Sequence, residues 1–164
     1  MGENTKITSH LFRHYHYLCL KFKTMYTGLS HLHHYLPYVL FFLMALVILK
    51  SIKGMVKGEA HLEGDKKLGL FAMITAHLQF TIGLVLYFIS PMVLGMGEAM
   101  GNATSRLYAL EHPLMMLIAV VLLTVARSKT KAATDTSAHK TTLVFFTISF
   151  AVILSRLPWA QWLA

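Results

Sequence analysis

Two histidines lie inside long apolar stretches of the sequence, where a polar side chain needs a partner. His77 lies in the run from Leu68 to Ser90, and His112 lies in a later run that begins near Ser105. A histidine within a bilayer costs free energy unless a neighbouring helix, a cavity or a metal compensates it. Two imidazoles that face each other from neighbouring helices can bind both axial positions of a haem iron. We therefore take His77 and His112 as the first candidate pair of haem b ligands.

Depth within the membrane gives a second combination. At about 1.5 Å per residue, His77 lies about 14 Å below one face and His112 about 9 Å below the other. Referred to a hydrocarbon core of about 30 Å, the two depths differ by about 7 Å. His33 lies at the outer edge of the first apolar run. It can replace one member of the pair, which would place the haem nearer the outer surface.

Three charged residues lie at or near the predicted outer end of the spans, as His112 does. Arg106 and Arg156 fall at the same predicted outer end and either bind the haem propionates or anchor their helices at the interface. Glu111 directly precedes His112, and a carboxylate at that depth needs a partner or a wet cavity. It can take up a proton, orient a ligand or pair with Arg106.

The composition defines the class of protein that must position these side chains. The chain has 164 residues, of which 55% are hydrophobic and 13% charged. These values are typical of an integral membrane protein, whose main partner is the lipid bilayer. The formal charge of +8 lies mainly in connections between apolar runs, so it indicates membrane topology and no nucleic-acid partner. The single cysteine, Cys19, excludes intramolecular disulfides and paired-cysteine metal sites.

Four apolar runs predict an all-α integral membrane fold, an antiparallel bundle of four transmembrane helices. The expected spans are about 33–50, 68–90, 105–126 and 140–157, within a domain of residues 25–164. Glycines and charges between residues 50 and 67 predict a loop there. A stripe of Gly69, Ala72, Ala76 and Gly83 allows another helix to approach the second span closely, which is more typical of helix packing than of cofactor binding.

Residues 1–24 form a leader that is too short and too interrupted to span a membrane. It is either an interfacial arm or the product of a misassigned start, since Met25 offers a second one.

The positive charges predict the orientation of the bundle. With the leader set aside, two connections on one side carry nine cationic residues against Arg106 and Arg156 on the other. They are Lys50, Lys53, Lys57, Lys66, Lys67, Arg127, Lys129, Lys131 and Lys140. The positive-inside rule then places these connections in the cytoplasm and both termini outside. Counting the leader weakens this difference without reversing it.

Two functions compete with haem binding. Met92, Met96 and Met100 recur at four-residue spacing in the outer connection, and His31, His33 and His34 lie on the same side of the membrane. Thioether and imidazole ligands suit Cu(I), which predicts copper handling, although three such methionines can equally form one apolar face of a short helix. The third possibility is a structural or assembly subunit without a cofactor, whose histidines are bonded between helices.

Several motifs resemble those of a small four-span membrane "cytochrome B" family of Bacteroidetes over about residues 25–159. They are His33-His-Tyr-Leu-Pro-Tyr38, Ala76-His77-Leu-Gln79 continuing through Gly83 and Tyr87 to Pro91, Glu111-His112-Pro, Arg127-Ser-Lys-Thr-Lys131 and His139-Lys140. The chain departs from the family where His34, Tyr35 and Pro37 replace a small residue, a glycine and an arginine. The resemblance implies a haem b electron-transfer subunit of the bacterial inner membrane, more an electron carrier than a stand-alone enzyme. It would act alone, as a homo-oligomer or within a larger respiratory or redox complex.

Overall fold

The computed structural model describes the backbone of residues 2–162 and the side chains of residues 20–160 and 162. The long helices are α1 (Gly2–Lys57), α2 (Glu63–Ile89), α5 (His112–Thr130) and α6 (Ser137–Ser155). Shorter ones are α3 (Met96–Ala99), α4 (Ala103–Arg106), the π-helix η1 (Leu107–Glu111) and α7 (Trp159–Trp162). No strand occurs within residues 2–162. Four helical segments are long and apolar enough to cross a membrane, which confirms the predicted fold class.

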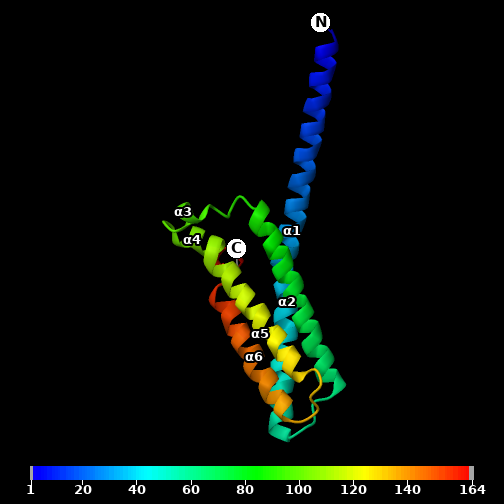
Figure 1. Ribbon diagram of the computed structural model, residues 1–164, viewed down its shortest axis with the longest axis vertical. Helices are drawn as coiled ribbons and strands as arrows, with labels where there is room; N and C mark the ends of the chain where they lie inside the picture. The colour runs from blue at the N-terminus through cyan, green and yellow to red at the C-terminus, as the bar shows by residue number, and fades with distance from the viewer. Residues whose placement is uncertain (1, 163–164) are drawn as a thin grey trace.

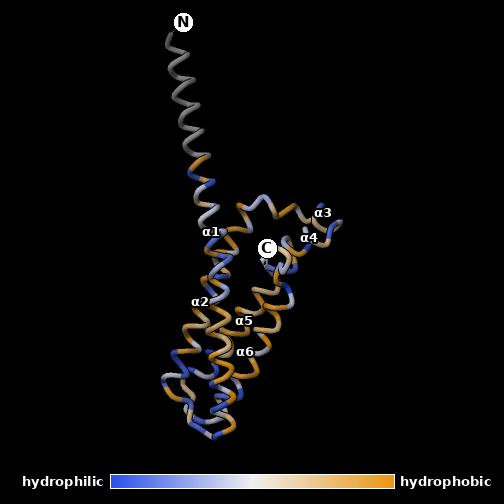
Figure 2. Tube along the Cα trace, turned by 180° about the vertical axis from the view of Figure 1, so that it is seen from behind, coloured by the Kyte–Doolittle hydropathy of each residue, from blue (hydrophilic) through white to orange (hydrophobic). Residues whose placement is uncertain are grey.

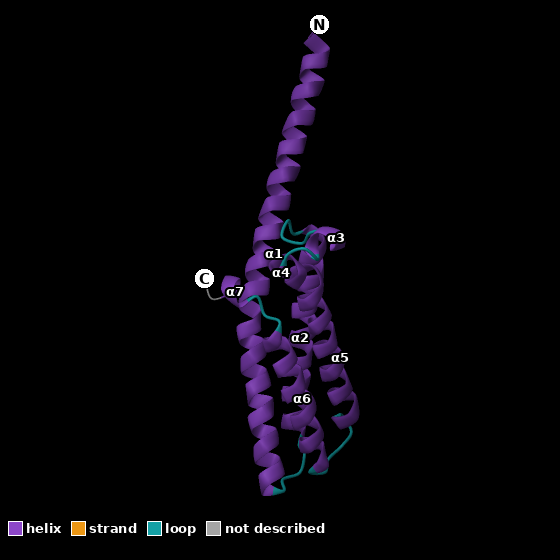
Figure 3. Ribbon diagram, turned by 90° about the vertical axis from the view of Figure 1, so that its left-hand side faces the viewer, coloured by secondary structure: helices purple, strands orange, loops and turns teal. Residues whose placement is uncertain are grey.

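The four long helices form an antiparallel bundle (Figures 1 and 3). α1 packs on α2 and on α6, and α5 packs on α2 and on α6, so each helix has two neighbours. The buried core contains Met44 of α1, Ala72 of α2, Leu123 of α5 and Phe146 of α6. Both ends of the described chain and the connection after α2 lie at one end of the bundle, while the two lysine-rich connections lie at the other.

Small residues on α2 bring its neighbours close, as the stripe in the sequence predicts. Ala72 and Ala76 are buried in the core. A Cβ atom at Gly69 would lie 3.9 Å from the ring of Phe146, which is an ordinary contact. At Gly83 it would lie only 2.7 Å from Cε1 of His33, so the ring of that histidine lies directly against the backbone of α2.

The first helix extends beyond the predicted span at both ends. It includes the leader and projects past the other helices (Figure 1). At its other end it continues through Lys57 and stops at Gly58, whose φ of 64° is favourable for glycine. The prediction that a loop begins at Lys50 is therefore wrong. Lysines are good helix formers, and those of these turns keep their charged ends in solvent while Ser51 and Gly54 face the bundle.

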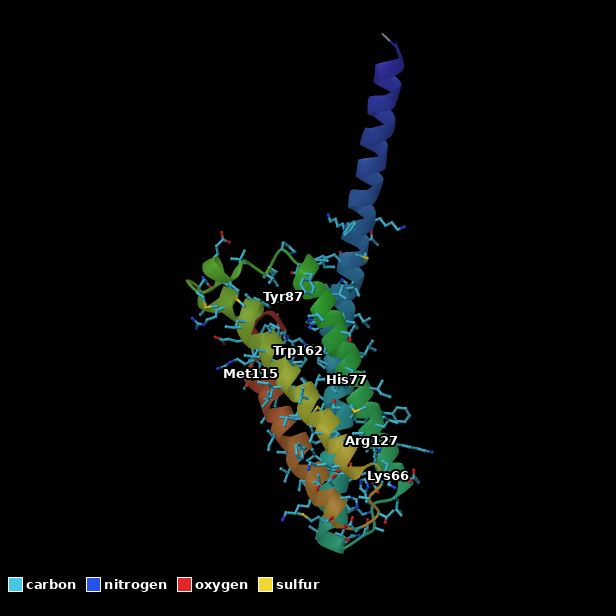
Figure 4. All side chains as sticks on the ribbon, viewed as in Figure 1. Lys66, His77, Tyr87, Met115, Arg127 and Trp162 are labelled. Carbon is cyan, nitrogen blue, oxygen red and sulfur yellow. The ribbon has the colours of Figure 1, made fainter. Side chains whose placement is uncertain are left out.

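The bundle end with the lysine-rich connections is tied together by polar contacts. The hydrophilic residues gather there, whereas the middle of the bundle is hydrophobic (Figure 2). Lys50 pairs with Asp65 at 2.8 Å, and Lys66 pairs with Glu63 at 2.9 Å. Arg127 of α5 donates to the carbonyl of Lys66 on α2 at 3.3 Å, and both residues are labelled at this end in Figure 4.

Candidate functional site

A cavity of about 400 Å³ lies between the long helices at the end of the bundle that carries the termini. α1, α2, α5 and the segment after α6 all contribute to its wall. Most lining side chains are apolar, and the polar ones include His33, His112, Gln79, Tyr87 and Tyr108. An apolar cavity with a few convergent polar groups is the usual form of a cofactor or ligand site.

Two prolines shape the cavity because each leaves a helix carbonyl without its normal backbone donor. Pro37 has no N–H to donate to the carbonyl of His33, and Pro113 has none for that of Ala109. Side chains of α2 replace them: Gln79 Nε2 donates to the His33 carbonyl at 2.8 Å, and the Tyr87 hydroxyl donates to the Ala109 carbonyl at 3.1 Å. α2 is thereby fixed to both helices that carry cavity histidines.

The last helix closes the cavity from the side of α6. Pro158 cannot donate to the carbonyl of Leu154, and the indole N–H of Trp159 donates to it at 3.1 Å. The indole N–H of Trp162 donates to the carbonyl of His34 on α1 at 3.2 Å, and its ring stacks on Tyr38 with centroids 4.8 Å apart. Trp162 therefore connects the C-terminal segment to α1 beside the cavity.

His33 and His112 approach each other inside this cavity. Their ring centroids are 6.3 Å apart and their planes are nearly perpendicular, at 82°. Nδ1 of His112 lies 2.8 Å from the carbonyl oxygen of Arg156. Since a carbonyl only accepts, this nitrogen carries the proton, and Nε2 of His112 keeps a free lone pair. Nδ1 of His33 lies 3.0 Å from Gln79 Nε2, so Nε2 is again the nitrogen left over.

His77 lies elsewhere, and the structure does not bring it to His112. Its Nδ1 donates to the carbonyl of Met73 at 2.8 Å, and its Nε2 lies 3.3 Å from the hydroxyl of Thr124 on α5. Thr124 follows His112 by about 18 Å along the helix axis. Figure 4 accordingly shows His77 further from the α3 end of the bundle than Tyr87. Of the two combinations that the sequence offers, His33 with His112 is the one whose members meet.

Glu111 joins the two arginines expected near the site. Its carboxylate lies 2.7 Å from Nε of Arg106 and 3.2 Å from Nε of Arg156, so the predicted Arg106 pair forms and a second pair accompanies it. Arg156 also supplies the carbonyl that anchors His112. The carboxylate therefore links the turn before His112 to the residue that orients its ring.

The three methionines of the copper hypothesis lie at the same end. Met92, Met96 and Met100 are each about half exposed, at 50%, 50% and 44%. Met92 follows α2 and contributes to the cavity wall, whereas Met96 begins α3 and Met100 caps it. Within the described residues, no group of three or more His, Cys, Asp or Glu side chains is arranged to bind a metal.

A second pair of imidazoles is buried at the lysine-rich end of the bundle. The rings of His61 and His139 have centroids 4.9 Å apart, and the residues are 3% and 2% exposed. Nε2 of His139 donates to the carbonyl of Ala60 at 3.4 Å, and its ring fills the space beside Gly54. Neither Nδ1 atom has a hydrogen-bond partner among the described residues. These two rings connect the α1–α2 loop to α6.

We expect acid to destabilise this end of the protein. Burial lowers the pKa of His61 below its usual value of 6.5, and the neighbouring His139 lowers it further. An unfolded chain therefore takes up this proton before the folded one does, so the stability that neutral His61 contributes is fully present above about pH 6.5 and is lost as the pH falls below it. The midpoint of thermal unfolding in detergent, measured between pH 8 and pH 5, tests this. His61→Asn should make the decline smaller, and an unchanged decline in that variant would contradict the assignment.

Sequence reasoning missed Gln79, Tyr87 and Trp162 as parts of the site. The available signal was the position of the prolines, since the carbonyl four residues before each proline must find another donor. Which side chain supplies that donor depends on the packing of separate helices. No protein-family model, curated protein or solved structure matches the chain.

Proposed function

We propose that the protein is a small membrane cytochrome that binds haem b in the cavity between α1, α2 and α5 and transfers electrons within the bilayer. The observation that carries this proposal is the convergence of His33 and His112 at 6.3 Å inside that cavity. Each ring engages a neighbour through Nδ1, which leaves Nε2 as the nitrogen without a hydrogen-bond partner among the described side chains.

The residues present fit such a group. His33 and His112 would hold the iron, since their rings come from separate helices and lie 6.3 Å apart. The surrounding wall is mainly apolar, as a porphyrin requires, and Gly83 leaves room for the ring of His33. Arg106 and Arg156, which both pair with Glu111, are cations that propionates could pair with, and Glu111 neutralises part of their charge.

Haem ligated by two imidazoles supplies a one-electron couple at iron with no open position for oxygen chemistry. The protein's part is to orient the ligands and exclude water. The hydrogen bond from His112 Nδ1 to the Arg156 carbonyl fixes the tautomer and makes Nε2 a better donor to metal. The ion pairs of Glu111 support that arrangement, because they join Arg156 to the turn before His112.

The location and partners of the protein belong to the same proposal. We infer a bacterial inner membrane, with the lysine-rich connections in the cytoplasm and both termini in the periplasm. The cavity would then lie in the periplasmic half of the bilayer. Electrons would enter and leave through a larger respiratory or redox complex or through a second copy of the chain.

The optical spectrum of the isolated protein tests this function directly. Protein purified in detergent from haem-replete cells should show a Soret band and, after dithionite reduction, the narrow bands of a six-coordinate b-type haem. A pyridine haemochrome assay should give about one haem per chain. A colourless preparation from haem-replete cells would refute the proposal, and metal analysis of the same sample would then test for copper.

A further inference from the structure

The amide of Gln79 contacts two acceptors of the same residue, His33. Its Nε2 lies 2.8 Å from the His33 carbonyl oxygen and 3.0 Å from His33 Nδ1. A primary amide nitrogen has two hydrogens, so it can donate to both. Donation to Nδ1 requires that this ring nitrogen be unprotonated, and the neutral imidazole then carries its proton on Nε2.

The orientation of this amide is set by Pro37. Because the proline cannot donate to the His33 carbonyl, that oxygen depends on Gln79 for its hydrogen bond. Turning the amide over would place Oε1 against the carbonyl oxygen, where two acceptors repel each other. Oε1 itself is buried and has no partner among the described residues. The proline thus determines the direction of the amide, and the amide determines the tautomer of His33.

The two cavity histidines therefore differ in what their free nitrogens offer. His112 donates from Nδ1 to the Arg156 carbonyl, so its Nε2 has a lone pair ready to bind a metal. His33 has an N–H at the corresponding position, which cannot bind a metal until the proton moves to Nδ1. The tautomer suited to ligation needs an acceptor beside Nδ1, and Gln79 offers a donor there.

We propose that Gln79 controls whether His33 binds the iron, so that His112 is the permanent axial ligand and His33 a conditional one. This inference rests on the proposed haem function, since it concerns the second ligand of the same haem. Gln79 is a positioning residue: it acts on the iron only through the proton position of His33. When the Gln79 amide moves away from Nδ1 of His33, the ring proton can shift from Nε2 to Nδ1, and Nε2 of His33 is then free to ligate.

The substitution Gln79→Glu tests this control in the metal-free protein. A buried carboxylic acid donates to the His33 carbonyl through its O–H and accepts from Nδ1–H through its other oxygen. We expect ¹⁵N-histidine NMR of the full chain in detergent to show an Nε2–H tautomer at His33, assigned by its loss in His33→Asn. In Gln79→Glu the ratio of tautomers should shift toward Nδ1–H by roughly tenfold or more. An Nδ1–H tautomer in the unaltered protein, or no shift in the variant, would overturn the proposal.

A matched control separates tautomer control from general loosening of α2. Tyr87→Phe removes the other α2 donor to a proline-freed carbonyl, which lies in η1 rather than in α1. It should leave the His33 signals unchanged; a shift as large as that of Gln79→Glu would contradict a specific role for Gln79.

The haem-loaded protein provides a separate measurement. Gln79→Glu should raise the low-spin, six-coordinate fraction of ferric haem, measured by absorption and electron paramagnetic resonance, above that of the unaltered protein. If haem binds and neither spin state nor tautomer responds, Gln79 has no control over ligation although the cytochrome function stands. If no haem binds, the function fails, and the NMR measurement alone decides the role of Gln79.

Discussion

Replacing His112 by alanine should abolish haem binding, with loss of the Soret band from protein expressed in haem-replete cells. The Nδ1–H of His112 is anchored on the Arg156 carbonyl, so its Nε2 has a free lone pair. Removing His112 leaves the cavity with His33, whose remaining ring nitrogen we propose to carry a proton. We expect the haem content per chain, measured by pyridine haemochrome, to fall at least tenfold.

The matched controls for this experiment come from the other histidines. His33→Ala should retain some haem with a high-spin spectrum, because only the conditional ligand is lost. His77→Ala should keep the spectrum of the unaltered protein, because His77 contacts Met73 and Thr124 and does not contribute to the cavity wall. Loss of the Soret band in His77→Ala, with normal haem in His112→Ala, would exclude the ligand assignment derived from the geometry.

The second large effect is expected at Gly54, where α1 packs against the ring of His139. A Cβ atom there would overlap the imidazole, which is buried and bonded to the Ala60 carbonyl. Gly54→Ala must therefore push α6 away from α1 or expel His139 from its site. Overpacking of this kind typically costs about 1–3 kcal/mol in the free energy of unfolding. Unfolding by SDS from detergent micelles, followed by circular dichroism, measures it.

Gly69→Ala is the comparison within the same bundle. Its added Cβ would lie 3.9 Å from Phe146, so the side chain fits without movement. Alanine in a helix interior is favoured over glycine by about 0.5–1 kcal/mol, and this variant should be slightly more stable than the unaltered protein. Equal destabilisation by both substitutions would show that the close contact at His139 is not the cause.

The architecture could be predicted because its causes are local. Long apolar runs interrupted by charge and glycine specify membrane-crossing helices, and short connections make successive helices antiparallel. Helix ends were predicted less well. The charge pattern predicts a loop from Lys50 onward, whereas helix α1 continues to Lys57 because exposed lysines do not stop a helix and Gly58 does.

The candidate histidine pair could not be predicted correctly from the sequence of the separate spans. Depths counted from the ends of predicted spans favoured His77 with His112, yet α2 meets α5 in a register that places His77 against Thr124. An error of a few residues in the predicted end of a span shifts the estimated depth of its histidine by several ångströms. When two spans are compared, the errors in both depths add. His33 is the neighbour of His112 because of how the faces of the helices pack together. That packing cannot be predicted from the sequence of any one helix.

By itself the sequence determined that the chain is a four-span helical membrane protein, that imidazoles lie within its apolar segments, and that each helix proline leaves one carbonyl needing a donor. The tertiary structure alone decided which residues meet those needs: Gln79 for the carbonyl of His33, and the Arg156 carbonyl for the ring of His112. The difference arises from how far apart in the sequence the interacting residues lie. Helix formation and insertion into lipid depend on residues close together in the chain, whereas a shared cavity depends on contacts between helices far apart in sequence.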